Sequence, residues 1–235
     1  DIATIINITP DHLDYHETFD RYVSSKLKII NFLKRNGIFI YDKSNKLLNK
    51  IIDANKYNSL KFSSVNEKEA KDFINDNNYL KGTHNAINAS IAISIAKKLN
   101  INDHKIELAI KRFEGLSHRM EPLYISNNFK IINDSKSTNG ESTAAALESF
   151  SNIFWIVGGK PKNDGIGQAK NFLDKVVEVF LIGNSTNFFC DQISKFKKGL
   201  SMHHCYTLEK ATQLAINKAA TSNLNNYVIL LSPSA

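Results

Sequence analysis

The sequence predicts an α/β protein in which a partial α/β domain precedes a Rossmann-like, doubly wound C-terminal domain. Three observations lead to this prediction. Short apolar runs alternate with longer amphipathic segments, which is the pattern of strands joined by helices in a parallel sheet. Hydrophobic residues make up 42% of the 235 residues, enough for one large or two medium domains. The pattern restarts after the polar segment 115–119, which therefore reads as a linker.

The first domain is expected to cover residues 1–115. Its opening run, Ile-Ala-Thr-Ile-Ile at 2–6, is typical of a buried strand, and later apolar residues recur at helical spacing. The polar segment 64–79 shows no clear hydrophobic periodicity. We expect strands at 1–7, 38–41 and 59–63, helices at 18–35, 44–55, 83–99 and 103–113, and an irregular β segment within 64–79.

The second domain is expected to cover residues 116–235. Strands and helices alternate through it, which favours a parallel sheet with helices on both faces. We expect strands at 122–133, 153–158, 177–182, 201–206 and 227–231, and helices at 140–150, 167–176, 186–196 and 207–220.

Composition excludes several classes of protein. No apolar run approaches the roughly 18 residues of a membrane span, and no signal peptide is visible. The two cysteines, Cys190 and Cys205, do not form a disulfide framework, which predicts reduced thiols and a cytoplasmic location. The net charge of +7 comes mostly from lysines spread along the chain, so nucleic-acid binding is only a remote alternative. The chain opens in mid-strand and stops after a strand, which predicts truncation at both ends.

The most informative segment is the polar turn 133–139, Asn-Asp-Ser-Lys-Ser-Thr-Asn, between a predicted strand and a predicted helix. Ligands of α/β domains lie at the carboxyl ends of strands, against helix N-termini. Asp134 is suited to a ribose hydroxyl or a cation, Lys136 to a phosphate and Thr138 to a substrate carboxylate. The alternative is a polar turn in which Thr138 or Asn139 only caps the helix.

Lys26 is the second informative residue, because a helical wheel of 18–35 places it near the centre of the apolar face. A buried lysine is costly unless it is paired, neutral or modified. A neutral amine can react with CO2, and the resulting carbamate is an anion that can bind Mg2+. The alternative is a lysine whose stem covers apolar surface while its ammonium reaches water.

Three further polar clusters lie at a strand end or a helix start. His12, in the segment after the first strand, is suited to Mg2+ or its waters. Asn85 and Asn88 lie three apart on one helical face, and their amides can pair with an adenine edge. Lys162 follows a Gly-Gly turn and can bind an anion. The alternative in each case is an ordinary turn or capped helix. No Gly-x-x-x-x-Gly-Lys-Ser/Thr phosphate loop occurs in the chain.

In their order along the chain, these motifs resemble the Mur ligase family. Asn-Ile-Thr-Pro-Asp-His-Leu-Asp at 7–14 is similar to a central-domain motif, and Arg-Tyr-Val-Ser-Ser-Lys at 21–26 to the segment with the carbamylated lysine. Gly-Thr-His-Asn at 82–85, with Asn88, resembles the adenine-binding motif. His-Arg-Met-Glu at 118–121 resembles the interdomain signature. The turn at 134–139 is close to the Asp-Ser-Lys-Ala-Thr-Asn of the family members that add D-glutamate.

The resemblance implies a central ATP-binding domain lacking its phosphate loop, followed by the C-terminal ligase domain. It implies ATP-dependent addition of D-glutamate to UDP-N-acetylmuramoyl-L-alanine through an acyl phosphate. We also expect a monomer that binds no nucleic acid or membrane. The alternative is another Mur-type or folylpolyglutamate-type ligase. These 235 residues alone are expected to be inactive. The implied roles are Mg2+ for Lys26 (as carbamate) and His12, nucleotide for Asn85, Asn88, Arg119 and Asp134, phosphate transfer for Lys136, and D-glutamate for Thr138 and Lys162.

Overall fold

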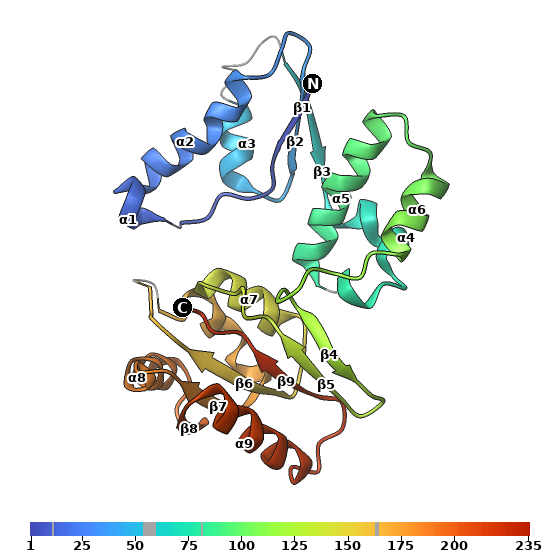
Figure 1. Ribbon diagram of the computed structural model, residues 1–235. Helices are drawn as coiled ribbons and strands as arrows, with labels where there is room; N and C mark the ends of the chain where they lie inside the picture. The colour runs from blue at the N-terminus through green and yellow to red at the C-terminus, as the bar shows by residue number, and fades with distance from the viewer. Residues whose placement is uncertain (11, 54–59, 81, 163–164) are drawn as a thin grey trace. The chain divides into compact units, whose positions relative to one another are not determined.

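The chain forms two units, Asp1–Phe113 and Glu114–Ala235. They are seen in a computed structural model (Figure 1). The structure describes residues 1–10, 12–53, 60–80, 82–162 and 165–235. Part of the helix expected at 44–55 and the start of the strand expected at 59–63 lie outside the described residues.

Unit 1 is built on a parallel sheet of order β1-β2-β3, formed by β1 (Ile2–Ile5), β2 (Ile38–Asp42) and β3 (Lys61–Val65). Alternate residues of β2 enter different cores because side chains of a strand point to opposite faces. Phe39 and Tyr41 pack in one core with residues of α2 (Phe19–Asn31) and α3 (Lys46–Asp53). Ile40 packs in the other with residues of α5 (Thr83–Lys98).

The expectation of an irregular β segment within 64–79 is wrong, because helices and turns follow the end of β3 at Val65. The segment contains the 3-10 helix η1 (Glu67–Ala70), the helix α4 (Lys71–Ile74) and the start of the 3-10 turn η2 (Asn78–Leu80). A capping box explains the difference, since Asn66 accepts from Lys68 N–H while its own N–H donates to Glu69. This small helical layer shares a core with α5 and α6 (Asp103–Lys111).

Unit 2 contains a six-stranded sheet of order β4-β5-β9-β6-β7-β8. All neighbouring pairs are parallel except β4 with β5, so the prediction of one strand at 122–133 is wrong. The chain reverses there because Ser126 N–H donates to Phe129 O and the Ser126 Oγ accepts from Phe129 N–H. The strands are β4 (Glu121–Ile125), β5 (Phe129–Asn133), β6 (Ile153–Gly158), β7 (Val176–Ile182), β8 (Ser201–Tyr206) and β9 (Tyr227–Leu231).

Helices cover both faces of this sheet, as the doubly wound prediction requires (Figure 1). One face packs against α7 (Gly140–Glu148), η3 (Gly167–Lys175) and α8 (Thr186–Phe196). The other face packs against α9 (Leu208–Ala220) through its alanines. The segment expected as a helix at 167–176 is helical, in 3-10 form. In the described part of the chain, no helix combines the length and the apolar character that crossing a bilayer demands.

Candidate functional site

The candidate site of unit 2 lies where the carboxyl ends of β5, β9 and β6 adjoin. The turn after β5 is tied to the segment after β9 by backbone hydrogen bonds. Asp134 N–H donates to Leu231 O at 2.8 Å, and Ser234 N–H donates to Ser137 O at 3.0 Å. Strand ends of this kind are where open α/β sheets bind ligands. The turn 134–139 is therefore held in the position that the sequence analysis expected for a ligand-binding segment.

The turn leads directly into α7, and its end is capped as predicted. The Asn139 side chain accepts from Ser142 N–H at 2.8 Å, which satisfies an N–H of the first helical turn. Ser137 is buried, and its Oγ lies 2.9 Å from Thr143 Oγ1. Because Asn139 is the N-cap, the exposed Thr138 does not have the capping role that was the alternative for it.

Asp134 is 94% buried (6% exposed), although a carboxylate rarely is. Its Oδ1 accepts from Met120 N–H at 3.1 Å and its Oδ2 from Ser232 Oγ–H at 3.2 Å. Burial raises the pKa of this carboxyl from its usual 3.8 to about 6, against the opposing effect of these hydrogen bonds, of Ser137 and of the Arg119 charge. Asp134 thus binds three segments of unit 2 to one another.

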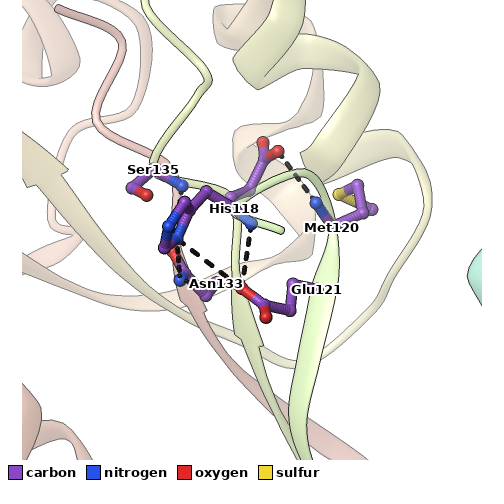
Figure 2. A network of polar contacts seen from close by, with 6 residues as sticks. His118, Met120, Glu121, Asn133 and Ser135 are labelled. Carbon is purple, nitrogen blue, oxygen red and sulfur yellow. Dashed lines mark hydrogen bonds and ion pairs between the residues drawn. The ribbon is translucent and has the colours of Figure 1, made fainter. Parts of the chain in front are cut away.

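A second network joins the segment 118–121 to the end of β5 (Figure 2). The Glu121 carboxylate accepts from His118 N–H at 2.8 Å and from Asn133 Nδ2 at 3.2 Å. Asn133 Nδ2 also lies 2.9 Å from His118 Nδ1, and its Oδ1 accepts from Ser135 N–H at 3.1 Å. Lys136 N–H donates to His118 O at 3.0 Å. The segment that carries Arg119 is therefore hydrogen-bonded directly to the turn that carries Lys136.

The remaining predicted residues of unit 2 lie at the same edge of the sheet. Arg119, Lys136 and Thr138 are exposed, whereas Lys162, which follows β6, is half-buried. Exposed cations beside the start of a helix form an environment that favours anions. The arrangement can bind phosphate or carboxylate groups.

In unit 1, His12 and Lys26 both lie around the ring of Tyr22. The Lys26 Nζ is 5.0 Å from the ring centre of Tyr22, and the ring of His12 is 6.4 Å from it. Lys26 is half-buried on the side of α2 that also buries Val23, as the helical wheel predicted. His12 is exposed and precedes α1 (Leu13–His16) in a left-handed conformation, with φ 54°.

Asn85 and Asn88 lie in the first two turns of α5, with Asn85 half-buried and Asn88 exposed. Between Thr83 and Asn85 lies His84, whose Nδ1 is buried without a hydrogen-bond partner among the described residues. Burial lowers the pKa of His84, so its imidazole is held in the neutral form. The sequence analysis assigned no role to this histidine, although it lies inside the Gly-Thr-His-Asn motif.

The residues of unit 1 fit a Mg2+ ion only if Lys26 is modified. Mg2+ prefers oxygen ligands, and the described residues contain no group of three or more His, Cys, Asp or Glu that could hold a metal ion. His12 offers a nitrogen, and the ammonium form of Lys26 would repel a cation. A carbamate on Lys26 would supply the missing oxygens.

Four polar residues to which the sequence analysis assigned no role hold the turn in place: Glu121, Asn133, Thr143 and Ser232. Ser232 and Thr143 are fully buried and hydrogen-bonded to each other at 3.2 Å. A signal for two of them was present, since Asn133 ends one apolar strand and Ser232 directly follows another. The hydrogen bond between Ser232 and Asp134 joins residues 98 positions apart, and a single sequence does not reveal such a pair.

Comparison with known proteins establishes the family. A family model described as the Mur ligase middle domain matches residues 1–101, and one described as the Mur ligase, glutamate ligase domain matches residues 118–235. The chain belongs to the Mur ligase family, as its motifs predicted. Among curated relatives, the chain is 30% identical to a UDP-N-acetylmuramoylalanine–D-glutamate ligase of Rickettsia felis and 32% identical to that of Zymomonas mobilis. These matches cover 99% and 100% of this chain but 55% and 51% of the relatives, so the chain spans about half their length.

Solved structures agree with the fold. MurF from Acinetobacter baumannii matches with a TM-score of 0.73 at 17% identity, covering 99% of this chain and 56% of that one. A bifunctional folylpolyglutamate synthase/dihydrofolate synthase from Yersinia pestis, solved with AMPPNP and a Mn ion, matches with a TM-score of 0.62 at 14% identity. It covers 100% of this chain and 59% of that one. At such identities, the likeness supports the fold alone.

Proposed function

We propose that the protein containing this chain is an ATP-dependent ligase that joins D-glutamate to UDP-N-acetylmuramoyl-L-alanine in peptidoglycan synthesis. The observation that carries this proposal is the turn 134–139, a D-glutamate-type motif, at the carboxyl end of β5 beside exposed cations. The names of the relatives that match 99–100% of the chain support the same substrate.

The proposed reaction has two steps. ATP phosphorylates the substrate carboxylate, forming an acyl phosphate and ADP. The amine of D-glutamate then attacks the acyl carbon, and the tetrahedral intermediate expels phosphate and loses a proton to leave an amide. Negative charge accumulates on the moving phosphoryl group, so a fixed cation contributes most there. Lys136, exposed on an ordered turn, is the proposed cation.

Nucleotide binding is proposed for four residues. Asn85 and Asn88, at the start of α5, would pair with the adenine edge, since an amide donates and accepts at once. Arg119 would contact phosphate. Asp134 would accept from a ribose hydroxyl through a remaining lone pair. Its 6% exposure suggests that much of its effect comes from ordering the segment that carries Arg119.

For D-glutamate, we propose that Thr138 and Lys162 bind the carboxylates, because a hydroxyl and an ammonium both donate hydrogen bonds to an anion. For the metal, we propose Mg2+ held by His12 and by Lys26 in its carbamate form, where it would screen phosphate charge. Both residues neighbour Tyr22, which supports a common role.

The specificity is tested with the complete gene product that carries these residues. Phosphate release from ATP should require UDP-N-acetylmuramoyl-L-alanine and, in a panel of amino acids, D-glutamate. Activity with another amino acid, or with a folate substrate, would favour the alternative that the folylpolyglutamate synthase-like fold keeps open. The matching assay on the 235 residues alone should show no turnover.

We further propose a cytoplasmic monomer without affinity for nucleic acid or membranes. The two free cysteines, Cys190 and Cys205, suit a reducing compartment. A titration with duplex DNA at low and high salt tests the competing view that the net charge of +7 marks a nucleic-acid-binding module. Tight, salt-dependent binding would support that view.

A further inference from the structure

Arg119 lies in a backbone conformation that its neighbours hold in place. His118 and Met120, on either side of it, both have positive φ values, 67° and 48°. Non-glycine residues rarely adopt such values, and they persist where the surroundings enforce them. Here each strained residue has its N–H bound by a carboxylate, that of His118 by Glu121 and that of Met120 by Asp134.

The same carboxylate of Glu121 also accepts from Asn133, and this connects the Arg119 segment to the turn with Lys136. Lys136 N–H closes the connection by donating to His118 O at 3.0 Å. We propose that His118, Glu121 and Asn133 are positioning residues that fix the Arg119 and Lys136 cations relative to one another. This inference rests on the proposed function for the roles of the two cations, but the arrangement of hydrogen bonds is independent of it.

The protonation state of His118 follows from this arrangement. Because Asn133 Oδ1 accepts from Ser135 N–H, its amide nitrogen must be the atom that faces His118 Nδ1 and Glu121 (Figure 2). An amide nitrogen only donates, so His118 Nδ1 must be the acceptor and the imidazole proton must lie on Nε2. We call the hydrogen bonds that join His118, Glu121 and Asn133 the interlock. It specifies one tautomer of a histidine whose side chain is 54% exposed.

An Asn133→Asp substitution tests the interlock with little change of shape. The new carboxylate can still accept from Ser135 N–H, but its second oxygen would face the Glu121 carboxylate and the lone pair of His118 Nδ1. Repulsion should drive a proton onto Nδ1. In the unmodified chain, Glu121 Oε2 accepts from both His118 N–H and Asn133 Nδ2. Adding Glu121→Gln removes the charge that repels the new carboxylate, but only one of its amide atoms, N or O, can take the place of Oε2. The double variant should therefore regain part of the connection.

The first measurement is multiple-bond ¹H–¹⁵N NMR of the imidazoles in the 235-residue chain, with His118 identified by its loss in His118→Gln. We expect Nδ1 of His118 to be unprotonated in the unmodified chain and protonated in Asn133→Asp. Asn127→Asp, an exposed change at the other end of β5, is the control and should leave the spectrum of His118 unchanged. A protonated Nδ1 in the unmodified chain would overturn the proposal.

The second measurement is turnover in the complete gene product. Asn133→Asp should lower kcat/KM for ATP about tenfold, the effect of losing one hydrogen bond to a charged group. Asn133→Asp should still unfold cooperatively on heating, and adding Glu121→Gln should restore part of the loss in kcat/KM. Unchanged kcat/KM in Asn133→Asp would refute the positioning role. If the unmodified protein has no turnover, the proposed function fails, whereas the NMR result still decides the interlock.

Discussion

Asp134 couples the folding of the chain to pH. Burial raises its pKa from 3.8 to about 6, so between these values the folded chain keeps a proton that the unfolded chain has lost. The stability that this group contributes is present below pH 3.8 and is lost as the pH rises through about 6. The linkage amounts to about 3 kcal/mol across the window.

The variant Asp134→Asn cannot titrate, so it should lack this pH dependence. We expect the free energy of unfolding of the unmodified chain, relative to the variant, to fall by about 3 kcal/mol between about pH 4 and about pH 7. Urea unfolding at both pH values measures the difference. Asp191→Asn, an exposed change in the same unit, controls for the loss of one negative charge. A difference that rises with pH would show that Asp134 is ionised in the folded chain throughout.

Lys26 is predicted to carry a carbamate, because it is half-buried against Tyr22 on the apolar side of α2. In the complete protein incubated with ¹³C-bicarbonate, a carbonyl carbamate signal should appear in the ¹³C spectrum and be absent from Lys26→Arg. Lys28→Arg, on the exposed side of the same helix, should keep the signal. Lys26→Ala should lose turnover, with no rescue by bicarbonate. A fully active Lys26→Ala would remove Lys26 from the mechanism.

At the scale of elements, Gly158 sets the path of the chain from β6 toward Lys162. Its φ is +139°, and a Cβ at this position would lie 2.1 Å from Ile182 O, an atom of the neighbouring strand that cannot move aside. We expect Gly158→Ala to lower the free energy of unfolding by about 3 kcal/mol, the upper end of the usual cost of overpacking.

Gly199→Ala is the matched control for this prediction. Gly199 also has a positive φ, +79°, but a Cβ there would meet no atom within 4 Å. It should cost about 1 kcal/mol, the strain of a side chain in a left-handed conformation. Thermal and urea unfolding of both variants measure the two losses of stability. Their difference is the cost of the close contact beyond that of the backbone strain. Equal losses would mean that β7 yields to the new methyl group.

The elements that could be predicted from the sequence are those bounded by clear apolar runs. The strands at 201–206 and 227–231 were predicted to the residue. The capped start of α7 was predicted with Thr138 or Asn139 as the cap, and Asn139 is the cap. The hairpin of β4 and β5 was missed because apolar residues continue on both sides of its turn at 126–128. The helices within 67–74 were missed because the segment is polar and shows no clear period. The capping box of Asn66 and Glu69 stabilises the first of them.

The position of the candidate site was predicted from the sequence, but the residues that hold it in place were not. The turn 134–139 could be found because charged and hydroxyl residues gather between a strand and a helix. Its anchors could not be found, since Ser232 lies 98 positions from Asp134 and becomes its neighbour only when β9 inserts beside β5. Hydrogen bonds of this kind depend on strand order, which hydrophobic periodicity does not encode.

At the scale of the whole molecule, the two units have separate hydrophobic cores. Among the described residues, every cluster of buried apolar side chains lies either within Asp1–Phe113 or within Glu114–Ala235. In unit 2, helices of the same unit cover both faces of the six-stranded sheet. A domain with its own covered sheet and core has what independent folding requires. We therefore predict that the units are domains, divided near residues 115 and 116.

This prediction is tested by producing residues 114–235 alone. The fragment should unfold cooperatively on heating, with the circular dichroism of an α/β protein. It should also keep the imidazole signals of His118 unchanged, because His118, Glu121, Asn133 and Ser135 all lie inside unit 2. Trypsin acting on the whole chain should cut first near Lys111 and Arg112, which are exposed, and leave a stable C-terminal fragment. An unfolded 114–235 fragment would show that the second unit depends on the first for its stability, despite its separate core.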